Sequence, residues 1–178
     1  NSLETWTSTS PQSNINADSI IWATDGEDDR SVAFAARLME KNIQVRVIDK
    51  ESILSGHELT RGSVAVLQMD NPNVADLSSI ISQTGSDLGI SIDSIESGFG
   101  PELLPDWGGR HFRLLEKPQV AILGHSNFNS YDVGVSWWSL DHHLGIRHTQ
   151  LNGSFTGYAD LRRYNVIIMP SGYLEMSD

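Results

Sequence analysis

The sequence predicts an α/β fold with two Rossmann-like halves, each a small, mostly parallel sheet flanked by helices in the manner of flavodoxin-like and amidotransferase-like folds. Three observations support this prediction. Hydrophobic residues make up 39% of the 178 residues, which is enough to form a core. Short β-prone runs alternate with segments of helical periodicity. This alternation also begins a second time, after a segment rich in glycine and proline.

The first half is predicted at residues 17–96, after a segment, 1–16, whose Ser, Thr and Asn content indicates a linker or a disordered start. Asp28 or Asp29 is placed to cap a helix whose apolar stripe includes Val32, Ala35, Ala36 and Met39. Asn71-Pro72-Asn73 predicts the start of a second helix, and the polar segment 50–62 is expected to be a loop. A buried strand is predicted at residues 19–23, an alternating strand at 43–48, a strongly β-prone run at 63–69 and a short strand at 91–95.

A connecting loop is predicted at residues 97–117, because residues 97–109 contain four glycines and two prolines. In the second half, 118–178, Ser130 is expected to cap a helix that ends at Gly145. The core stripe of that helix is predicted to be Val133, Trp137, Leu140 and Leu144. Strands are predicted at residues 119–123, 147–151 and 165–169. Their short connections favour parallel pairing, and we expect this half to be truncated, with a further helix and strand beyond Asp178.

The composition argues against several classes of function. The formal net charge is -11, and the linear sequence has no cluster of Lys and Arg, so nucleic acids and anionic membrane surfaces are disfavoured as partners. The absence of cysteine excludes thiolate chemistry, disulfides and cysteine-based metal sites. No apolar run approaches the length that spans a bilayer.

Several runs in the second half carry a resemblance to a known family. They are Lys117–Gly124, Ser130–Asp141, Leu144–Ile146 and Tyr164–Pro170. Together they resemble the class I glutamine amidotransferase-like domain that follows the catalytic domain in some large bacterial zinc carboxypeptidases of the M14 class. The run Gly62–Pro72 is similar to a strand and turn that precede that domain in the same proteins. The resemblance covers about two-thirds of the chain.

The resemblance implies a non-catalytic accessory region of an exported, periplasmic or extracellular, bacterial zinc carboxypeptidase. Its partners would be other domains of the same polypeptide, and it would act in domain packing or substrate presentation. Zinc would belong to the parent protein, because none of the six histidines is followed by Glu three residues later. Two alternatives stay open: a fragment of an amidotransferase-like enzyme whose nucleophile lies beyond the chain end, and a binding module for a small polar ligand or glycan.

One loop is the candidate ligand site. It follows the predicted strand 119–123, and ligands of open α/β sheets bind at the carboxyl ends of strands, against helix N-termini. Its hydrogen-bonding residues are His125, Ser126, Asn127, Asn129 and Ser130. The glycine-rich phosphate fingerprint is missing, so a well-capped surface loop is an equal interpretation.

Three other groups favour structural interpretations. His142 and His143 lie in the last turn of a predicted helix, where a cation complements the helix dipole, and with His148 they are a weaker zinc candidate. The acidic cluster at residues 25–29 fits a helix N-terminus better than a calcium site. Trp137 is predicted to be buried in the core, and Trp138 is predicted to be partly exposed and to pack on a neighbouring domain.

Overall fold

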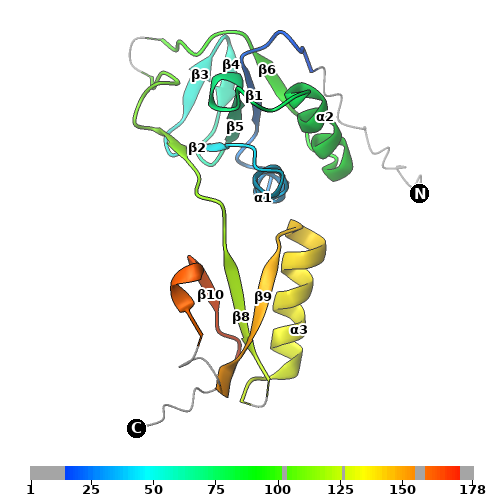
Figure 1. Cartoon of the computed structure of the whole chain (residues 1–178). Helices are drawn as coiled ribbons and strands as arrows, with labels where there is room; N and C mark the ends of the chain where they lie inside the picture. The colour runs from blue at the N-terminus through cyan, green and yellow to red at the C-terminus, as the bar shows by residue number, and fades with distance from the viewer. Residues whose placement is uncertain (1–14, 102–103, 126, 155–158, 173–178) are drawn as a thin grey trace, which may run out of the picture. The chain divides into compact units, whose positions relative to one another are not determined.

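The structure is a computed structural model that describes residues 15–101, 104–125, 127–154 and 159–172. By its internal contacts, the chain divides into two units. The first unit is Asn1–Ser31 with Gln44–Leu114, and the second is Val32–Ile43 with Leu115–Asp178. The second unit therefore includes most of the helix α1 (Arg30–Glu40), which lies in the sequence between two strands of the first unit (Figure 1).

The first unit contains a five-stranded sheet with the order β6-β1-β5-β2-β7. Every pair in it is antiparallel, so the prediction of a mostly parallel sheet is wrong for this half. The strands are β1 (Ile21–Thr24), β2 (Arg46–Ile48), β5 (Val64–Leu67), β6 (Asp93–Ile95) and β7 (Phe112–Leu114). β1 and β2 do run in the same direction, as a helical connection between them requires, but β5 lies between them and runs against both.

Two segments that were expected to be loops contain strands. Residues 50–62 form a hairpin of β3 (Ser52–Leu54) and β4 (His57–Leu59). The turn between them has positive φ at both Ser55 (49°) and Gly56 (84°). Positive φ at both central residues is typical of a two-residue type I′ turn, whose twist matches that of the two strands it joins. The segment 97–117 contributes β7, which pairs with β2. Its sequence, Phe-Arg-Leu, is too short to show a period, so only pairing reveals it as a strand.

The helix α2 (Leu77–Leu88) begins later than the turn at Asn71-Pro72-Asn73 predicted. Asn71 is buried and holds two backbone segments together instead of starting a helix. Its Oδ1 accepts from the Gln44 backbone N–H at 2.7 Å, and its Nδ2 donates to the carbonyls of Gln44 and Leu67, each at 3.0 Å. A short 3-10 helix, η1 (Gln68–Asp70), comes directly before Asn71. The core of the first unit is Ile21, Ala23, Ile48, Leu54, Leu59, Ala65, Leu67, Ile95, Trp107 and Phe112.

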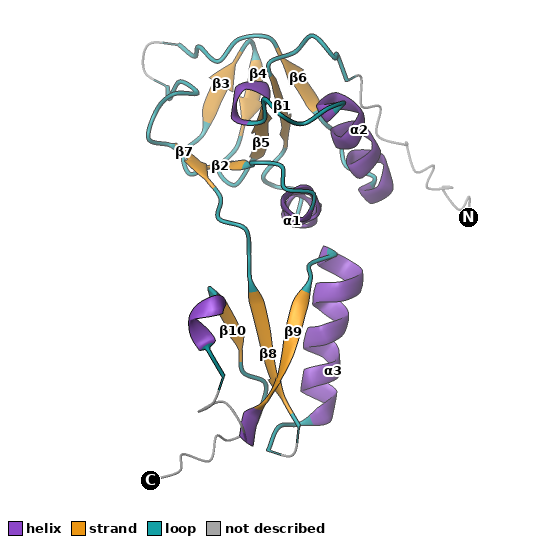
Figure 2. Cartoon of the chain, viewed as in Figure 1, coloured by secondary structure: helices purple, strands orange, loops and turns teal. Residues whose placement is uncertain are grey.

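The second unit contains a three-stranded parallel sheet with the order β10-β8-β9, so the prediction of a parallel sheet is confirmed for this half. The strands are β8 (Val120–Gly124), β9 (His148–Asn152) and β10 (Val166–Ile168). The helix α3 (Ser130–Trp138) connects β8 to β9 and runs beside them (Figure 2). It continues as a π-helical turn, η2 (Ser139–Leu144), and a 3-10 turn, η4 (Leu161–Arg163), precedes β10.

The N-cap of α3 is Asn129 and not Ser130, which is the first helical residue. The helix ends as expected, at Gly145 in the left-handed conformation. Its inner side joins a core of Ala36, Val120, Ile122, Leu140 and Ile146, with Val133, Leu144 and Ile168 packed against it. Among the described residues, none forms a helix that is long and apolar enough to cross a bilayer.

Candidate functional site

The predicted ligand loop lies at the carboxyl end of β8 and turns sharply. His125 is exposed and has a φ of 72°, and the backbone N–H of Phe128 donates to the His125 carbonyl at 2.9 Å. Phe128 is buried and forms an isolated bridge with Gly172. Ser126 lies outside the described residues. The loop is therefore fastened to the segment that follows β10.

One polar side chain of the loop, that of Asn129, holds the start of α3. Asn129 Oδ1 accepts from the backbone N–H groups of Tyr131 at 2.9 Å and Asp132 at 3.4 Å, and the Asn129 N–H donates to the Ser171 carbonyl at 2.7 Å. Ser130 is exposed. The amide nitrogen of Asn127 is buried and has no hydrogen-bond partner among the described residues. A ligand at this loop thus stays a prediction, and capping already accounts for Asn129.

The histidines of the second unit serve separate contacts. The His142 ring lies 5.6 Å from the Trp137 ring and 5.9 Å from the Trp138 ring, measured between centroids. His148 Nδ1 lies 3.2 Å from the Ile146 carbonyl, which can only accept, so this nitrogen carries the hydrogen. In the part of the chain that the structure describes, no group of three or more His, Asp or Glu side chains could hold a metal ion.

The acidic cluster at residues 25–29 is bound by protein donors. Asp25 Oδ1 accepts from the Glu27 N–H at 3.1 Å and from the Thr60 hydroxyl at 2.8 Å. Asp28 forms an ion pair with Arg30, with 2.6 Å between Asp28 Oδ2 and Arg30 Nη2. The hydrogen bond from Arg30 lowers the pKa of Asp28. Asp28 therefore contacts the first residue of α1, as expected for a carboxylate at a helix N-terminus, whereas Asp25 connects the preceding turn to Thr60.

A histidine–aspartate pair in the first unit was not predicted from the sequence. His111 Nδ1 lies 2.7 Å from Asp49 Oδ1, and Arg110 Nε donates to His111 Nε2 at 3.4 Å. Asp49 and Arg110 therefore each contact one ring nitrogen of His111 and together orient its ring. The contact with Asp49 holds the His111 side chain next to the start of β7.

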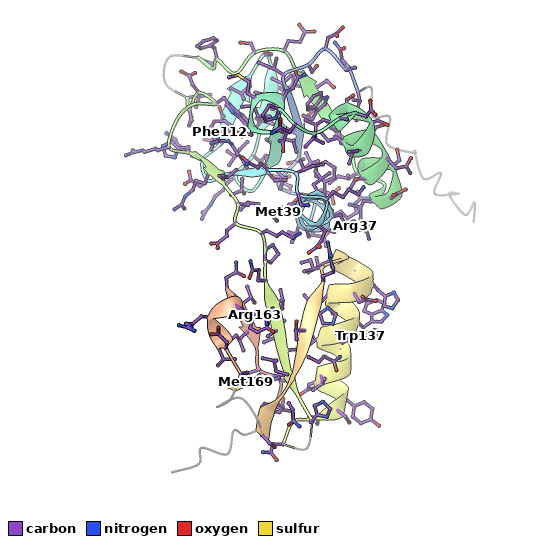
Figure 3. The ribbon with its side chains drawn as sticks, in the orientation of Figure 1. Arg37, Met39, Phe112, Trp137, Arg163 and Met169 are labelled. Carbon is purple, nitrogen blue, oxygen red and sulfur yellow. The ribbon has the colours of Figure 1, made fainter. Side chains whose placement is uncertain are left out.

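α3 and the π-helical turn η2 that continues it carry a largely aromatic stripe on their outer side, which we call the outer stripe and define as Tyr131, Val135, Trp138 and His142. These residues are spaced by four, three and four positions, so they lie on one side of the helix, opposite Val133 and Leu140. The side chains of Tyr131, Val135 and Trp138 are 84%, 66% and 55% exposed. Trp137, labelled on α3 in Figure 3, is 37% exposed, so it is less buried than its place in the predicted core stripe indicated.

A polar hollow of about 440 Å³ lies at the amino edge of the parallel sheet, entirely within the second unit. We call it the amino-edge hollow. Its lining contains three cationic side chains and one carboxylate: Lys117, Arg147, Arg163 and Glu40. This hollow was not predicted from the sequence, because ligands of open α/β sheets are expected at the carboxyl ends of the strands.

Glu40 is the electrostatic centre of the amino-edge hollow. Its side chain is 13% exposed, and its Oε2 accepts from Arg147 Nε at 2.8 Å and lies 3.5 Å from Lys117 Nζ. Burial raises the pKa of Glu40, but the hydrogen bond from Arg147 and the charges of Lys117 and Arg147 outweigh it, so the net shift of this pKa is downward. Glu40 is therefore ionised at neutral pH and pairs with two of the three cations.

No family model, curated protein or solved structure matches the chain.

Proposed function

We propose that the chain is a non-catalytic accessory region of a larger, exported zinc carboxypeptidase of the M14 class, and that it packs against another domain of the same polypeptide. The parent class comes from the resemblance of the runs between Lys117 and Pro170. The observation that carries the packing role is the outer stripe of α3.

The outer stripe supports domain packing because α3 has apolar residues on two opposite sides. A surface helix normally carries one apolar side, and a helix that is apolar on both sides is buried on both. Tyr, Trp and Val concentrated on an exposed side are typical of contact surfaces between domains. His142, in ring contact with Trp137 and Trp138, adds to the aromatic area of this surface.

The exposed edge of the parallel sheet supports the same proposal. β10 is an edge strand, and Val166 and Ile167 are 41% and 43% exposed. Met169, which follows β10, is 61% exposed (Figure 3). An edge strand with exposed apolar side chains is a place where a further strand or helix can pack. We propose that this sheet belongs to an amidotransferase-like fold, a proposal supported by its parallel strands with β8 in the middle.

Side-chain oxidation by hydroxyl radicals tests the packing role. The full parent polypeptide and the chain described here are oxidised under identical conditions, and modification is measured at Tyr131, Trp138 and Met69. Tyr131 and Trp138 are expected to be protected in the parent polypeptide. Met69, which is 82% exposed in the first unit, is the internal control and should react equally in both samples.

Equal oxidation of Tyr131 and Trp138 in the two samples would refute the packing role. The parent class is tested separately, by measuring zinc in the purified parent polypeptide and its hydrolysis of C-terminal peptide bonds. One bound zinc per chain and carboxypeptidase activity are expected. A parent without zinc would contradict the proposed class, whatever the outer stripe contacts.

A further inference from the structure

The three cations of the amino-edge hollow are brought together by the topology of the parallel sheet. Each precedes a different strand: Lys117 comes before β8, Arg147 before β9 and Arg163 before β10. The register pairs Val120 of β8 with the first residue of each neighbouring strand. Since parallel strands begin at the same edge, residues that are far apart in the sequence meet there.

A side-chain amide holds the strand starts in this arrangement. Asn165 Oδ1 accepts from the Gln119 N–H at 2.7 Å, and Asn165 Nδ2 donates to the Lys117 carbonyl at 3.0 Å. The Asn165 N–H donates to the Gln119 carbonyl at 3.1 Å. The backbone that carries Lys117 and the backbone that follows Arg163 are therefore tied to each other. Their side chains start from fixed positions beside the same hollow.

The charges of the hollow are not balanced by its own carboxylate. Glu40 pairs with Arg147 and Lys117, whereas Arg163 has no ion pair within 4.0 Å among the described residues. The neighbouring Arg162 does have one, with 2.8 Å between its Nε and Asp160 Oδ1. The charge of Arg163 adds only a smaller contribution to the hydrogen bond from Arg162 that lowers the pKa of Asp160. The Arg147 side chain is 84% exposed, and only its Nε takes part in a hydrogen bond that the described residues supply. Guanidinium donors are therefore available at the rim of the hollow.

We propose that the amino-edge hollow binds a small polar molecule through a phosphate or carboxylate group. Arginine offers planar donor pairs that match the oxygens of both groups. The local excess of positive charge lies in a chain with a net charge of -11, so the hollow attracts an anion that most of the surface repels. A volume of about 440 Å³ accommodates a small molecule larger than the anionic group itself. This inference is independent of the parent protein proposed above.

Titration of the isotope-labelled chain by NMR tests the proposal. Backbone amide shifts are followed with potassium phosphate and with potassium succinate, each against potassium chloride at equal ionic strength. Saturable shifts are expected at residues 117, 119–120, 147–149 and 163–166, and the anion that saturates at the lower concentration identifies the preferred group. If neither anion produces saturable shifts beyond those of chloride, the proposal is overturned.

Variants separate a specific site from general charge attraction. Arg163→Ala is expected to weaken binding of the preferred anion about five- to tenfold, the effect of losing one charge-assisted contact at an open site. Arg162→Ala is the matched control, because Arg162 is adjacent, carries the same charge and is paired with Asp160. Glu40→Gln should strengthen binding, because it removes the internal carboxylate that competes for Arg147 and Lys117. Equal weakening by both arginine variants would overturn the proposal.

Discussion

Replacing Arg46 by Met should destabilise the first unit by about 2–3 kcal/mol. Arg46 Nε and Nη2 donate to the two carboxylate oxygens of Asp70, at 2.6 and 3.0 Å. A third donor, Nη1, reaches the Phe112 carbonyl at 3.0 Å, and the guanidinium lies 5.8 Å from the centre of the Trp107 ring. The hydrogen bonds that Arg46 donates to Asp70 raise the pKa of Arg46, as a well-formed ion pair does.

The magnitude follows from the partial burial of the pair. The side chains of Arg46 and Asp70 are 26% and 15% exposed. Breaking a fully buried ion pair by removing one partner costs about 3–5 kcal/mol, and an exposed pair contributes about 0–1 kcal/mol. Arg46→Met also leaves the Phe112 carbonyl without its side-chain donor. The expected loss of stability on Arg46→Met therefore lies between the values for an exposed and a fully buried ion pair, and closer to the buried value.

Urea unfolding followed by circular dichroism measures this cost, with an expected decrease of about 1–2 M in the midpoint. Arg113→Met is the control, because Arg113 lies on β7 of the same sheet, is 69% exposed and is 3.8 Å from Asp49. The double variant Arg46→Met with Asp70→Leu should recover part of the loss, because no buried carboxylate then lacks a counterion. If Arg46→Met shifts the midpoint no more than the control does, the reasoning is refuted.

Four further substitutions test local features. Gly26→Ala should cost more than about 2 kcal/mol in urea unfolding, because a Cβ there would overlap the Ser63 backbone, whereas Gly134→Ala, with open space around it, should stabilise the chain by about 0.5–1 kcal/mol. Asn129→Ala should lower thermal stability by about 1 kcal/mol through loss of the α3 cap, and an unchanged melting curve would contradict that role. The lowered pKa of Glu40 means that its stabilisation is present above its ordinary value of 4.5 and is lost as the pH falls through the folded value. Glu40→Gln should therefore flatten the acid limb of the stability profile, and an identical acid limb would count against the ion pairs.

The fold shows which parts of a strand pattern a sequence reveals. Runs such as Ile21–Ala23 and Val120–Leu123 are apolar at every position and buried, and both are strands. One lies in an antiparallel sheet and the other in a parallel sheet. A strand covered on both faces is continuously apolar in either case, so the run indicates burial and not direction. The direction of β5 relative to β1 depends on pairing between distant residues, which no local pattern encodes.

The core-facing side of α3 was predicted correctly from the sequence, whereas its exposed side was not. Val133, Leu140 and Leu144 recur at helical spacing and face the core as expected. The outer stripe has the same spacing, and it was visible in the sequence at Tyr131, Val135 and Trp138. A sequence search that assigns one apolar side to each helix does not find the outer stripe. The outer stripe is recognised as a second apolar side only when the residues that face the core are known.

The basic residues of the amino-edge hollow could also have been predicted from the sequence to lie close together. Lys117, Arg147 and Arg163 are separated by 30 and 16 positions, so a search for neighbouring basic residues finds no cluster. The predicted strands 119–123, 147–151 and 165–169, taken as parallel, already placed their starts at one edge. Each start is at or just after a basic residue. The usual rule for open α/β sheets directs attention to the carboxyl edge, where Asn129 caps α3. In this chain the excess of positive charge lies at the opposite edge, so electrostatics is the better guide to where an anion would bind.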